Sequence, residues 1–407
     1  MHRTRPGTLG ISQTAATAAV AGSRNTRITA TGLAIAVVTV VIVLNILYQF
    51  LISYPGDSLR DFGSFYESGR AALEGRNPYA IHDLTYRVEL KHFNGANPNL
   101  NPPVSLLLMA PVSLLDPGIT YRTLWWGSLA AFLAALVYLA RTYQPPGGRW
   151  LLLWALSLPG FWGTLFLGQI YVPLMIAAAA VWILQDRGRL VEAGLLIGLV
   201  AAFKPNFLVW PVVLFLAGHW RIAIPALLAF AVLSVAPVLF FGIDIYPQWI
   251  EMVANDDPGR VLWVTNMSVI AYAGRLDIPW LGRIAALALL LATAWWAWRR
   301  RPDVRDAGLI ALVVSLFASP VAWIHYVLFL LPPLFCVRWS RVMVAGALLL
   351  ATPRLIANTL FEGPTWVELS LGSVYIWGLL LLVAPRIWQL ATQGGSAFAG
   401  PAPVDGQ

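Results

Sequence analysis

Charged residues are scarce in this sequence of 407 residues. Asp, Glu, Lys and Arg make up only 11% of it, whereas 58% is hydrophobic; an average soluble domain carries roughly 25% charged residues. A chain with so little charge and so much apolar side-chain surface excludes a soluble globular protein, a disordered chain and a fibrous one. The composition therefore indicates a protein surrounded largely by lipid.

Cysteine and lysine are nearly absent as well. The single cysteine, Cys336, excludes an internal disulfide, and no cluster of Cys and His predicts a zinc site. The sequence has no P-loop, no GxGxxG motif and no DxD metal pair, so we expect no cofactor, no metal and no nucleic-acid partner. The only lysines are Lys91 and Lys204, and Lys204 is conspicuous because it lies at the end of an apolar run.

Long apolar runs dominate what is present. Twelve runs are candidates for crossing the roughly 30 Å hydrocarbon core of a bilayer. Three pairs of runs are joined by almost nothing, at Gly168-Gln169, at Lys204-Pro205 and at Ile324, which predicts tight hairpins. A thirteenth run, 102–115, is short, carries three prolines and predicts a re-entrant or juxtamembrane helix. The twelve runs are 30–53, 119–140, 150–167, 169–185, 190–204, 206–218, 222–242, 279–298, 307–323, 325–337, 342–358 and 368–385.

Basic residues are distributed unevenly over the loops between these runs. With the N-terminus in the cytoplasm, the inner segments contain 16 basic residues and 5 acids, and the outer segments contain 11 basic residues and 14 acids. The net charge of +8 thus divides into +11 inside and −3 outside. Positive charge concentrated in cytoplasmic loops is the established rule of orientation. We therefore expect a multi-pass protein of the plasma (inner) membrane with both termini in the cytoplasm.

This topology predicts three parts of the chain and two long outer loops. The outer loops are 54–118 and 242–278, and the first contains a predicted amphipathic helix at 61–74, with Phe62, Phe65, Tyr66 and Leu73 on a helical period. The parts are a cytoplasmic N-terminal tail (1–29), a transmembrane domain (30–385) and a disordered cytoplasmic tail (386–407).

Polar and ionisable side chains gather at the predicted outer ends of the runs. Ionisable groups at membrane depth are costly and indicate function. A carboxylate there is suited to act as general base on a hydroxyl, and a lysine or histidine to bind a phosphate and stabilise its charge as it departs. Because nucleotide sugars stay in the cytoplasm, a sugar donor used at this face has to be borne by a lipid. The residues are Asp57, Asp61, Asn97, Asn99, Asn101, Gln169, Lys204, Asn206, Asn266, Ser268, Trp323 and His325.

Several of these residues also have a purely structural interpretation. Lys204 is able to extend to the outer headgroups, and His325 to act as a hydrogen-bonded interfacial histidine. Asp61 is suited to cap the helix that follows it. Asn266 and Gln169 are suited to hold hairpins together by hydrogen bonds. The convergence of five distant segments on one face favours the functional interpretation.

The ordered set of motifs resembles glycosyltransferase family 87, whose members have the GT-C fold. The resemblance covers roughly residues 30–385. It begins with the first-loop stretch from Asp61 to Tyr79. The fold implied is an all-α polytopic membrane protein with about 12 transmembrane helices and short juxtamembrane helices in the first outer loop. The later motifs, in order, are Pro102-Pro103, Ala110-Pro111, Gly168-Gln169, Lys204-Pro205, Asn266-Met267-Ser268, Ser319-Pro320, Trp323 and His325.

The resemblance implies an inverting transfer of mannose at the outer membrane face. The donor would be polyprenyl-phosphate-mannose, and the acceptor a hydroxyl of a lipid-linked mannoside such as a phosphatidylinositol mannoside. Asp61 would be the general base, and Lys204 and His325 would bind or orient the donor phosphate. A metal is not obligatory, because a polyprenyl phosphate is already a good leaving group. The residues implied for the sugar or acceptor pocket are Tyr66, Arg70, Gln169, Asn206, Asn266 and Trp323.

Some alternatives stay open at this point. Asp57, four residues before Asp61, is a rival for the general base, whereas Asp256 and Asp257 are expected to be a solvated loop pair. The donor is alternatively decaprenyl-phosphate-arabinose, which would make the chain an arabinofuranosyltransferase. A function of another class, a lipid or solute transporter, is disfavoured because transporters place their polar residues at the bilayer midplane and contain inverted repeats.

Overall fold

The structure is a computed structural model that describes residues 13–393. The ends of the two predicted tails, 1–12 and 394–407, lie outside the described residues. The chain divides into two compact units after Tyr48, so that most of α1 (Gln13–Ser53) forms the first unit and all other helices belong to the second.

Helix α1 begins earlier than the sequence predicts. The predicted tail extends to residue 29, whereas the helix begins at Gln13. Its segment Ile35–Ser53 is long and apolar enough to cross a membrane. Apolar side chains such as Leu33, Val41 and Leu47 are more than half exposed, as expected for a helix that faces lipid.

The second unit is helical apart from one small hairpin. The two strands are β1 (Tyr86–Leu90) and β2 (Phe93–Asn97), and the rest of the described unit consists of helices and loops, as expected for an all-α membrane protein. The helices are α2 (Arg60–Leu73), α3 (Val104–Val112), α4 (Pro117–Tyr143), α5 (Gly148–Ser157), α6 (Pro159–Leu167), α7 (Tyr171–Asp186), α8 (Leu190–Phe203), η1 (Pro205–Leu208), α9 (Val209–Leu216), α10 (Trp220–Phe241), α11 (Ile245–Ala254), η2 (Pro258–Leu262), α12 (Val269–Arg275), α13 (Pro279–Arg300), α14 (Val304–Phe317), η3 (Ile324–Leu330), α15 (Leu331–Phe335), α16 (Arg341–Leu350), α17 (Arg354–Phe361), α18 (Thr365–Leu369) and α19 (Val374–Gln393).

Fewer helices than predicted qualify as complete membrane spans. By length and composition, five helices in the described part of the chain are able to cross a membrane, or seven if each of two bent pairs is one span. The predicted twelve spans are therefore not confirmed, because the other apolar runs form shorter helices. Pair α5 and α6 is bent by 42° and pair α16 and α17 by 82°. A proline, Pro159 or Pro353, stands at each break, where it disfavours a helical conformation of the preceding residue.

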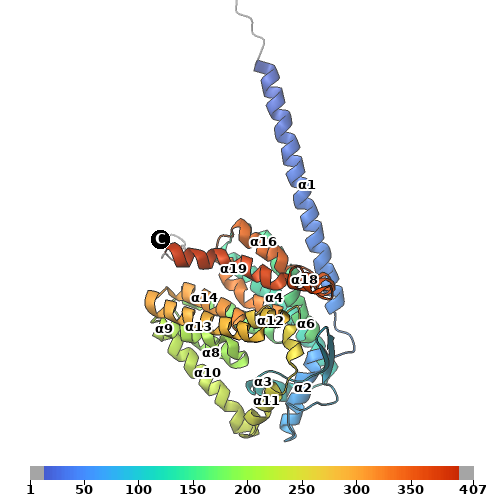
Figure 1. Ribbon diagram of the computed structural model, residues 1–407, viewed down its shortest axis with the longest axis vertical. Coiled ribbons are helices and arrows are strands. Elements are labelled where there is room, and N and C mark those ends of the chain that lie inside the picture. Colours follow the sequence, from blue (N-terminus) through green and yellow to red (C-terminus); the bar gives the residue numbers. More distant parts are fainter. Residues whose placement is uncertain (1–12, 394–407) are drawn as a thin grey trace, which may run out of the picture. The chain divides into compact units, whose positions relative to one another are not determined.

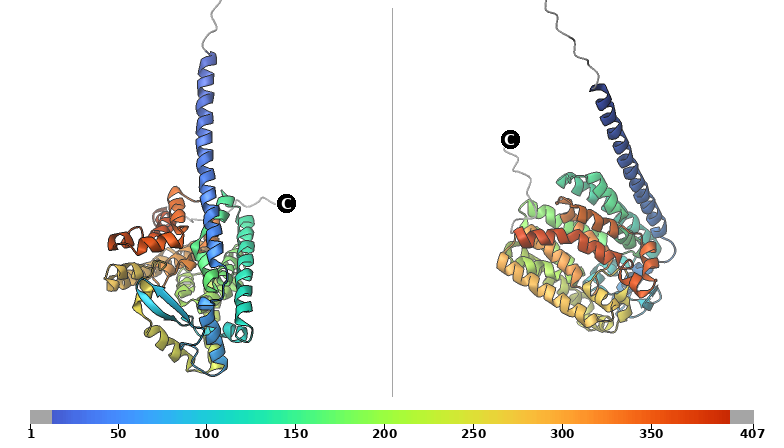
Figure 2. Two further views of the ribbon diagram at one scale, coloured as in Figure 1. Left: turned by 90° about the vertical axis from the view of Figure 1, so that its right-hand side faces the viewer. Right: turned by 45° about the horizontal axis from the view of Figure 1, so that its top comes forward.

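The first outer loop folds back on the helices. Helix α2 confirms the predicted helix at 61–74 within one residue, but it is not a surface helix, because every residue from Asp61 to Gly69 is buried. The β1–β2 hairpin packs beside α2 (Figure 2, left) and pairs Tyr86 with Asn97 at its open end. The hairpin thereby brings Asn97 next to the first turn of α2.

Helices of the second unit pack closely where small residues meet. Figure 1 shows α8 beside α10 and α13 beside α14. A Cβ atom on Gly198 of α8 would lie 2.4 Å from the carbonyl oxygen of Ala226 in α10. Small residues let membrane helices approach in this way, since lipid supplies no hydrophobic force that drives them together.

Loops predicted on the inner side contact each other. His219 Nε2 lies 2.8 Å from the Pro302 carbonyl oxygen, and Arg386 donates to the Arg338 carbonyl oxygen at 3.0 Å. Arg386 belongs to α19, which continues to Gln393. Residues 386–393 are therefore helical, whereas the sequence predicts disorder from residue 386.

Candidate active site

Asp61 lies in the first turn of α2, buried among residues from three distant segments. Its Oδ1 accepts a hydrogen bond from Asn97 Nδ2 at 2.8 Å, and its Oδ2 accepts one from Gln169 Nε2 at 2.6 Å. Only 5% of the residue is exposed. Leu59, not Asp61, is the N-cap residue of α2. The capping interpretation is therefore wrong, because the carboxylate is hydrogen-bonded to side chains of β2 and of the α6–α7 turn instead.

Burial changes the acidity of this carboxyl. Removal from water raises the pKa of Asp61, while hydrogen bonds from Gln169 and Asn97 and the positive charges of Arg260 and Lys204 partly offset the rise. A carboxylate with a raised pKa holds a proton more strongly once it has taken one. The environment of Asp61 thus suits a general base.

Arg260 of η2 fixes the amide that faces Asp61. Its Nη1 donates to Asn97 Oδ1 at 2.6 Å, and its Nε donates to both carboxylate oxygens of Asp256, at 3.0 and 2.8 Å. Because a guanidinium only donates, the Asn97 carbonyl has to face Arg260 and the Asn97 NH2 group has to face Asp61. Asp256 was expected to be solvated; the structure corrects this, since it pairs with an arginine that is 4% exposed. Asp257 instead accepts from the backbone N–H of Gly259.

Lys204 ends α8 and is enclosed by protein. Its Nζ donates to Asn101 Oδ1 at 2.7 Å and lies 4.5 Å from the centroid of the Tyr171 ring. Asn101 is held in turn by Asn99 Oδ1. With 7% of the residue exposed, the headgroup interpretation is wrong. An ammonium over an aromatic face is stabilised by the ring quadrupole, and its two other protons are directed to no protein acceptor in the described part of the chain.

His325, at the start of η3, lies against the same tyrosine. Its ring stacks on Tyr171 at 5.2 Å and 15°. Its Nδ1 lies 2.8 Å from the Gly160 carbonyl oxygen and 3.3 Å from Thr164 Oγ1. Since a carbonyl only accepts, Nδ1 carries the proton, and Nε2 of the neutral ring is left to accept a hydrogen bond. Tyr171, which the sequence did not single out, thus joins Lys204 to His325.

Two arginines that the sequence did not single out complete this side of the site. The guanidinium carbons of Arg60 and Arg354 lie 3.4 Å and 5.8 Å from the centroid of the Phe166 ring. An added Cβ on Gly163 would meet His325 Cε1 at 2.7 Å and Arg354 Nη1 at 3.5 Å. The missing side chain at Gly163 therefore keeps open the space where the imidazole and the guanidinium adjoin.

Two residues predicted for the sugar pocket are not brought to this cluster. Tyr66 donates its hydroxyl to the Leu115 carbonyl oxygen at 2.8 Å and packs in an apolar cluster with Phe62. Arg70 pairs with Glu67 at 2.5 Å, and its side chain is 41% exposed. Both have structural partners on or near α2, so the structure gives no support to a pocket role.

Asn266 holds two outer loops together. Its Nδ2 donates to the Val261 and Pro320 carbonyl oxygens at 2.8 and 2.9 Å, and it forms an isolated β-bridge with Trp323. These contacts fit the structural interpretation, in which Asn266 holds hairpins together by hydrogen bonds. Asn206 donates a long hydrogen bond, 3.4 Å, to the Ser315 carbonyl oxygen and links η1 to α14.

Asp57, the rival base, is exposed in the segment before α2. Within residues 13–393, no three His, Cys, Asp or Glu side chains gather in a way that would hold a metal ion.

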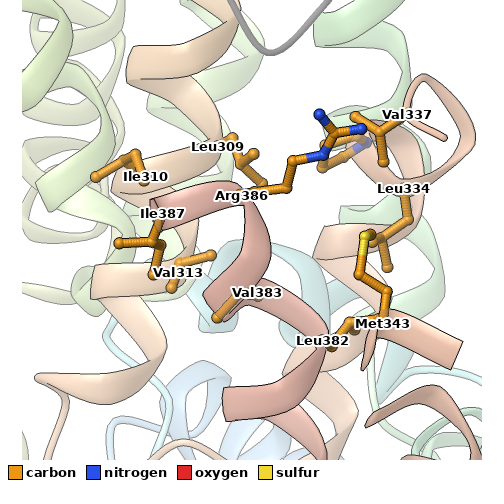
Figure 3. A pocket seen from close by; sticks show the side chains of 11 residues that line it. Leu309, Ile310, Val313, Leu334, Val337, Met343, Leu382, Val383, Arg386 and Ile387 are labelled. Atoms are coloured by element: carbon orange, nitrogen blue, oxygen red, sulfur yellow. The ribbon is translucent and has the colours of Figure 1, made fainter. Parts of the chain in front are cut away.

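An apolar crevice lies away from these residues (Figure 3), between α14, α15, α16 and α19. No residue predicted for the site lines that crevice. Its lining includes Leu309, Val313, Leu334, Met343, Leu382 and Arg386.

Three known proteins resemble this chain, one of them over most of its length and two over about half of it. It is 29% identical over 371 residues to the polyprenol-phosphate-mannose-dependent alpha-(1-2)-phosphatidylinositol pentamannoside mannosyltransferase of Mycolicibacterium smegmatis, which covers 82% of this chain and 84% of that protein. It is 28% identical over 213 residues to a polyprenol-phosphate-mannose-dependent alpha-(1-2)-phosphatidylinositol mannoside mannosyltransferase of Mycobacterium tuberculosis, over 47% of this chain and 49% of that one. A Mycolicibacterium smegmatis protein of the same description is 31% identical over 250 residues, with 53% and 55% covered.

No solved structure gives a significant match. The sequence profile of glycosyltransferase family 87 matches residues 99–320, more than half of the chain. That range contains Gln169, Lys204 and Asn266, three of the residues on which the resemblance rested. The chain therefore belongs to glycosyltransferase family 87.

Proposed function

We propose that this protein transfers mannose from polyprenyl-phosphate-mannose to a hydroxyl of a lipid-linked mannoside. The activities for which the three mycobacterial relatives are named support the donor and the phosphatidylinositol mannoside class of acceptor. The observation that carries the proposal is the buried carboxylate of Asp61, which two amides hold and on which the buried Lys204 acts electrostatically. A base and a cation in one site are what the displacement of a lipid phosphate by a hydroxyl requires.

Asp61 is the proposed general base. One of its oxygens takes the proton of the acceptor hydroxyl while that hydroxyl oxygen attacks the anomeric carbon of the donor. Gln169 supports this role, since its Nε2 donates to Asp61 while its Oε1 is buried and has no hydrogen-bond partner among residues 13–393. A buried acceptor without a donor is unfavourable. A substrate hydroxyl bound next to Asp61 supplies that donor, so Gln169 is proposed to line the sugar pocket.

The proposed displacement is a single inverting step. As the new bond to the anomeric carbon forms, the bond from that carbon to the phosphate oxygen breaks, and its electron pair leaves with the polyprenyl phosphate. One base and one stabilised leaving group suffice, without a covalent intermediate. Lys204 supplies positive charge toward the phosphate through its free protons. His325 orients the donor through its Nε2 lone pair, which favours a contact with a donor hydroxyl over one with the phosphate itself.

We place the reaction at the outer face of the plasma membrane, in a GT-C fold of about twelve spans with cytoplasmic termini. The arginine-rich loops support this orientation. Contacts between loops support the assignment of segments to the same side of the membrane. Asn97 and Gln169 donate to Asp61, and Arg260 donates to Asn97, and all four residues lie in segments predicted on the outer side. The shorter helices, such as α7 and α8, are proposed to complete the set of spans.

The direct test is a transfer assay of purified protein in lipid nanodiscs. Mannosyl- and arabinosyl-phosphate polyprenols are supplied side by side with a phosphatidylinositol mannoside acceptor, and the product is analysed by mass spectrometry and NMR. We expect mannose transfer with inversion at the anomeric carbon. Transfer of arabinose alone, retention of configuration, or movement of lipid without transfer each contradicts the proposal.

A further inference from the structure

Positive charge around Asp61 exceeds the negative charge that balances it. Lys204 and Arg260 both act electrostatically on Asp61. Arg354 is attracted by the charge of Asp61 and repelled by that of Arg60. Arg260 is balanced by its bidentate pair with Asp256. Among the residues that the structure describes, the single carboxylate of Asp61 therefore remains to balance three cations, Lys204, Arg60 and Arg354.

Arg60 and Arg354 are the two cations left over. Neither has an Asp or Glu within ion-pair distance among the residues that the structure describes. Both guanidiniums instead lie over one aromatic ring, that of Phe166, and each is half-buried. Two like charges gathered in a medium of low dielectric repel each other. An anion bound between them removes that repulsion.

The backbone brings both arginines to this place at a cost. Arg60 has a φ of +53°, a left-handed conformation that disfavours a residue with a Cβ by roughly 1–2 kcal/mol. Arg354 begins α17, directly after the 82° bend that separates this helix from α16. Such strain persists where the surrounding structure maintains it, often at ligand sites.

We propose that Arg60 and Arg354 form the subsite for the phosphate of the lipid donor. The inference rests on the proposed transfer reaction and extends it to residues outside those predicted from the sequence. A planar guanidinium matches two phosphate oxygens at once, which a lysine cannot do. Phe166 holds the two planes, and the site adjoins both Asp61 and His325.

The charge change of the reaction explains why two guanidiniums are present. The donor phosphate is a diester with one negative charge. When the bond to the anomeric carbon breaks, the phosphate keeps the electron pair and becomes a monoester with a second negative charge. Two cations therefore bind the departing phosphate more strongly than the intact donor, and such differential binding accelerates the step. Lys204, on the Tyr171 side, is then left to contact the sugar or the opposite face of the phosphate.

A phosphate in this membrane has two possible sources, the donor and the headgroup of phosphatidylinositol in the acceptor. Binding experiments separate them. Full-length protein in nanodiscs is titrated with heptaprenyl phosphate, with uncharged heptaprenol, and with phosphatidylinositol. The variants are Arg60→Gln and Arg354→Gln, with Arg354→Lys to retain the charge. Arg87→Gln is the matched control, since Arg87 is exposed on β1.

We expect each Gln variant to bind heptaprenyl phosphate about tenfold more weakly, with heptaprenol and phosphatidylinositol binding unchanged. Arg354→Lys should recover part of the loss, and the control should match wild type. Unchanged heptaprenyl phosphate binding in both Gln variants, at wild-type thermal stability, overturns the subsite. So does selective loss of phosphatidylinositol binding. If a Gln variant is unstable, the charge-retaining Arg354→Lys variant decides the question, because the subsite requires that it bind heptaprenyl phosphate more tightly than Arg354→Gln does. If wild type binds heptaprenyl phosphate through these arginines but transfers no mannose, the result contradicts the proposed function and leaves the phosphate subsite intact.

Discussion

The two ends of the helical unit use charge in opposite ways. At the end predicted to face the cytoplasm, arginines such as Arg187 and Arg299 are exposed. At the other end, Asp61, Lys204 and Arg260 are each at most 7% exposed and are hydrogen-bonded to side chains from distant segments. An exposed charge keeps its hydration and costs the fold little, whereas a buried charge is unfavourable unless partners offset the loss of water.

This difference separates orientation from chemistry. The exposed arginines need no particular geometry in order to keep a loop on one side of a membrane. The buried groups hold fixed positions, since Arg260 orients Asn97 and Asn97 orients the carboxylate of Asp61. Substitutions at the buried end should therefore change catalysis, and substitutions at the exposed end should not.

The largest effect is expected for Asp61→Asn. Loss of the base should lower kcat by roughly 10²–10⁴-fold, measured as mannose transfer under saturating donor. The amide is nearly isosteric, and the Gln169 side chain is able to turn its unpartnered Oε1 toward the new NH2 group, so the fold should be kept. Asp57→Asn is the matched control and should stay near wild type; the reverse result would assign the base to Asp57.

The pH dependence tests the same carboxylate. Because burial raises the pKa of Asp61, kcat/KM should increase with pH and level off above a midpoint higher than the ordinary value of about 3.9. The folded state holds the proton more strongly than the unfolded state, so this stabilisation is complete below the unfolded pKa and is lost as pH rises through the folded pKa. Asp61→Asn should accordingly raise the unfolding temperature at neutral pH, and an unchanged temperature across the pH range contradicts the raised pKa.

Lys204→Met should have the next largest effect. Met keeps the volume and apolar stem but removes the ammonium that Asn101 and Tyr171 hold. We expect a donor KM increased by roughly tenfold or more, since a charge-assisted contact contributes about 1.5–3 kcal/mol. Initial rates over a donor series and an acceptor series provide the measurement. A change confined to the acceptor series would show that Lys204 does not contact the donor.

Arg260→Lys tests whether positioning at a distance matters. Lysine retains the charge beside Asp256 but loses the fork that reaches Asn97 Oδ1 at the same time. The Asn97 amide is then free to turn, and kcat should decrease by about tenfold with little change in either KM. If Arg260→Lys lowers the thermal stability but leaves kcat per folded molecule unchanged, Arg260 has only a structural role.

The smallest effect is expected at the exposed end. The double substitution Arg299→Gln and Arg300→Gln removes two charges from the last turn of α13. Since both residues are exposed, the rate of transfer by correctly inserted protein should change by less than about twofold, in line with the small effect of surface charges. Activity measured per folded molecule in nanodiscs provides the check, and a large loss would remove the contrast between the two ends.

Local sequence predicted much of this molecule. Helix α2 begins one residue before its predicted position, and the proline-rich run at 102–115 contains a short helix, α3, as expected, with Pro103 at its start and Pro111 inside its last turn. The β1–β2 hairpin was missed because only β1 alternates apolar and polar residues, whereas its partner, the stretch Phe93–Asn97 with a central glycine, does not. The number of spans stays a prediction, since apolar composition alone does not distinguish a helix that crosses a membrane from a shorter one that packs inside the protein.

The site was predicted in part. Asp61, Gln169, Lys204 and His325 were selected because an ionisable or amide group in apolar surroundings is visible in any sequence. Arg60 and Arg354 were overlooked, since arginines at the ends of apolar runs are commonplace and nothing local shows that both will lie over the distant ring of Phe166. Arg70 was selected on the same local grounds, and the structure pairs it with its neighbour Glu67.

The sequence by itself determined that this chain belongs with a membrane and which carboxylate stands out at the end of an apolar run, because those properties depend on composition and order along the chain. Only the tertiary structure decided what each charge contacts. Asp61 became a candidate base rather than a helix cap when β2 and the α6–α7 turn placed two amides on its oxygens. Buried charges are governed by distance and dielectric, and those are set only once distant segments pack together.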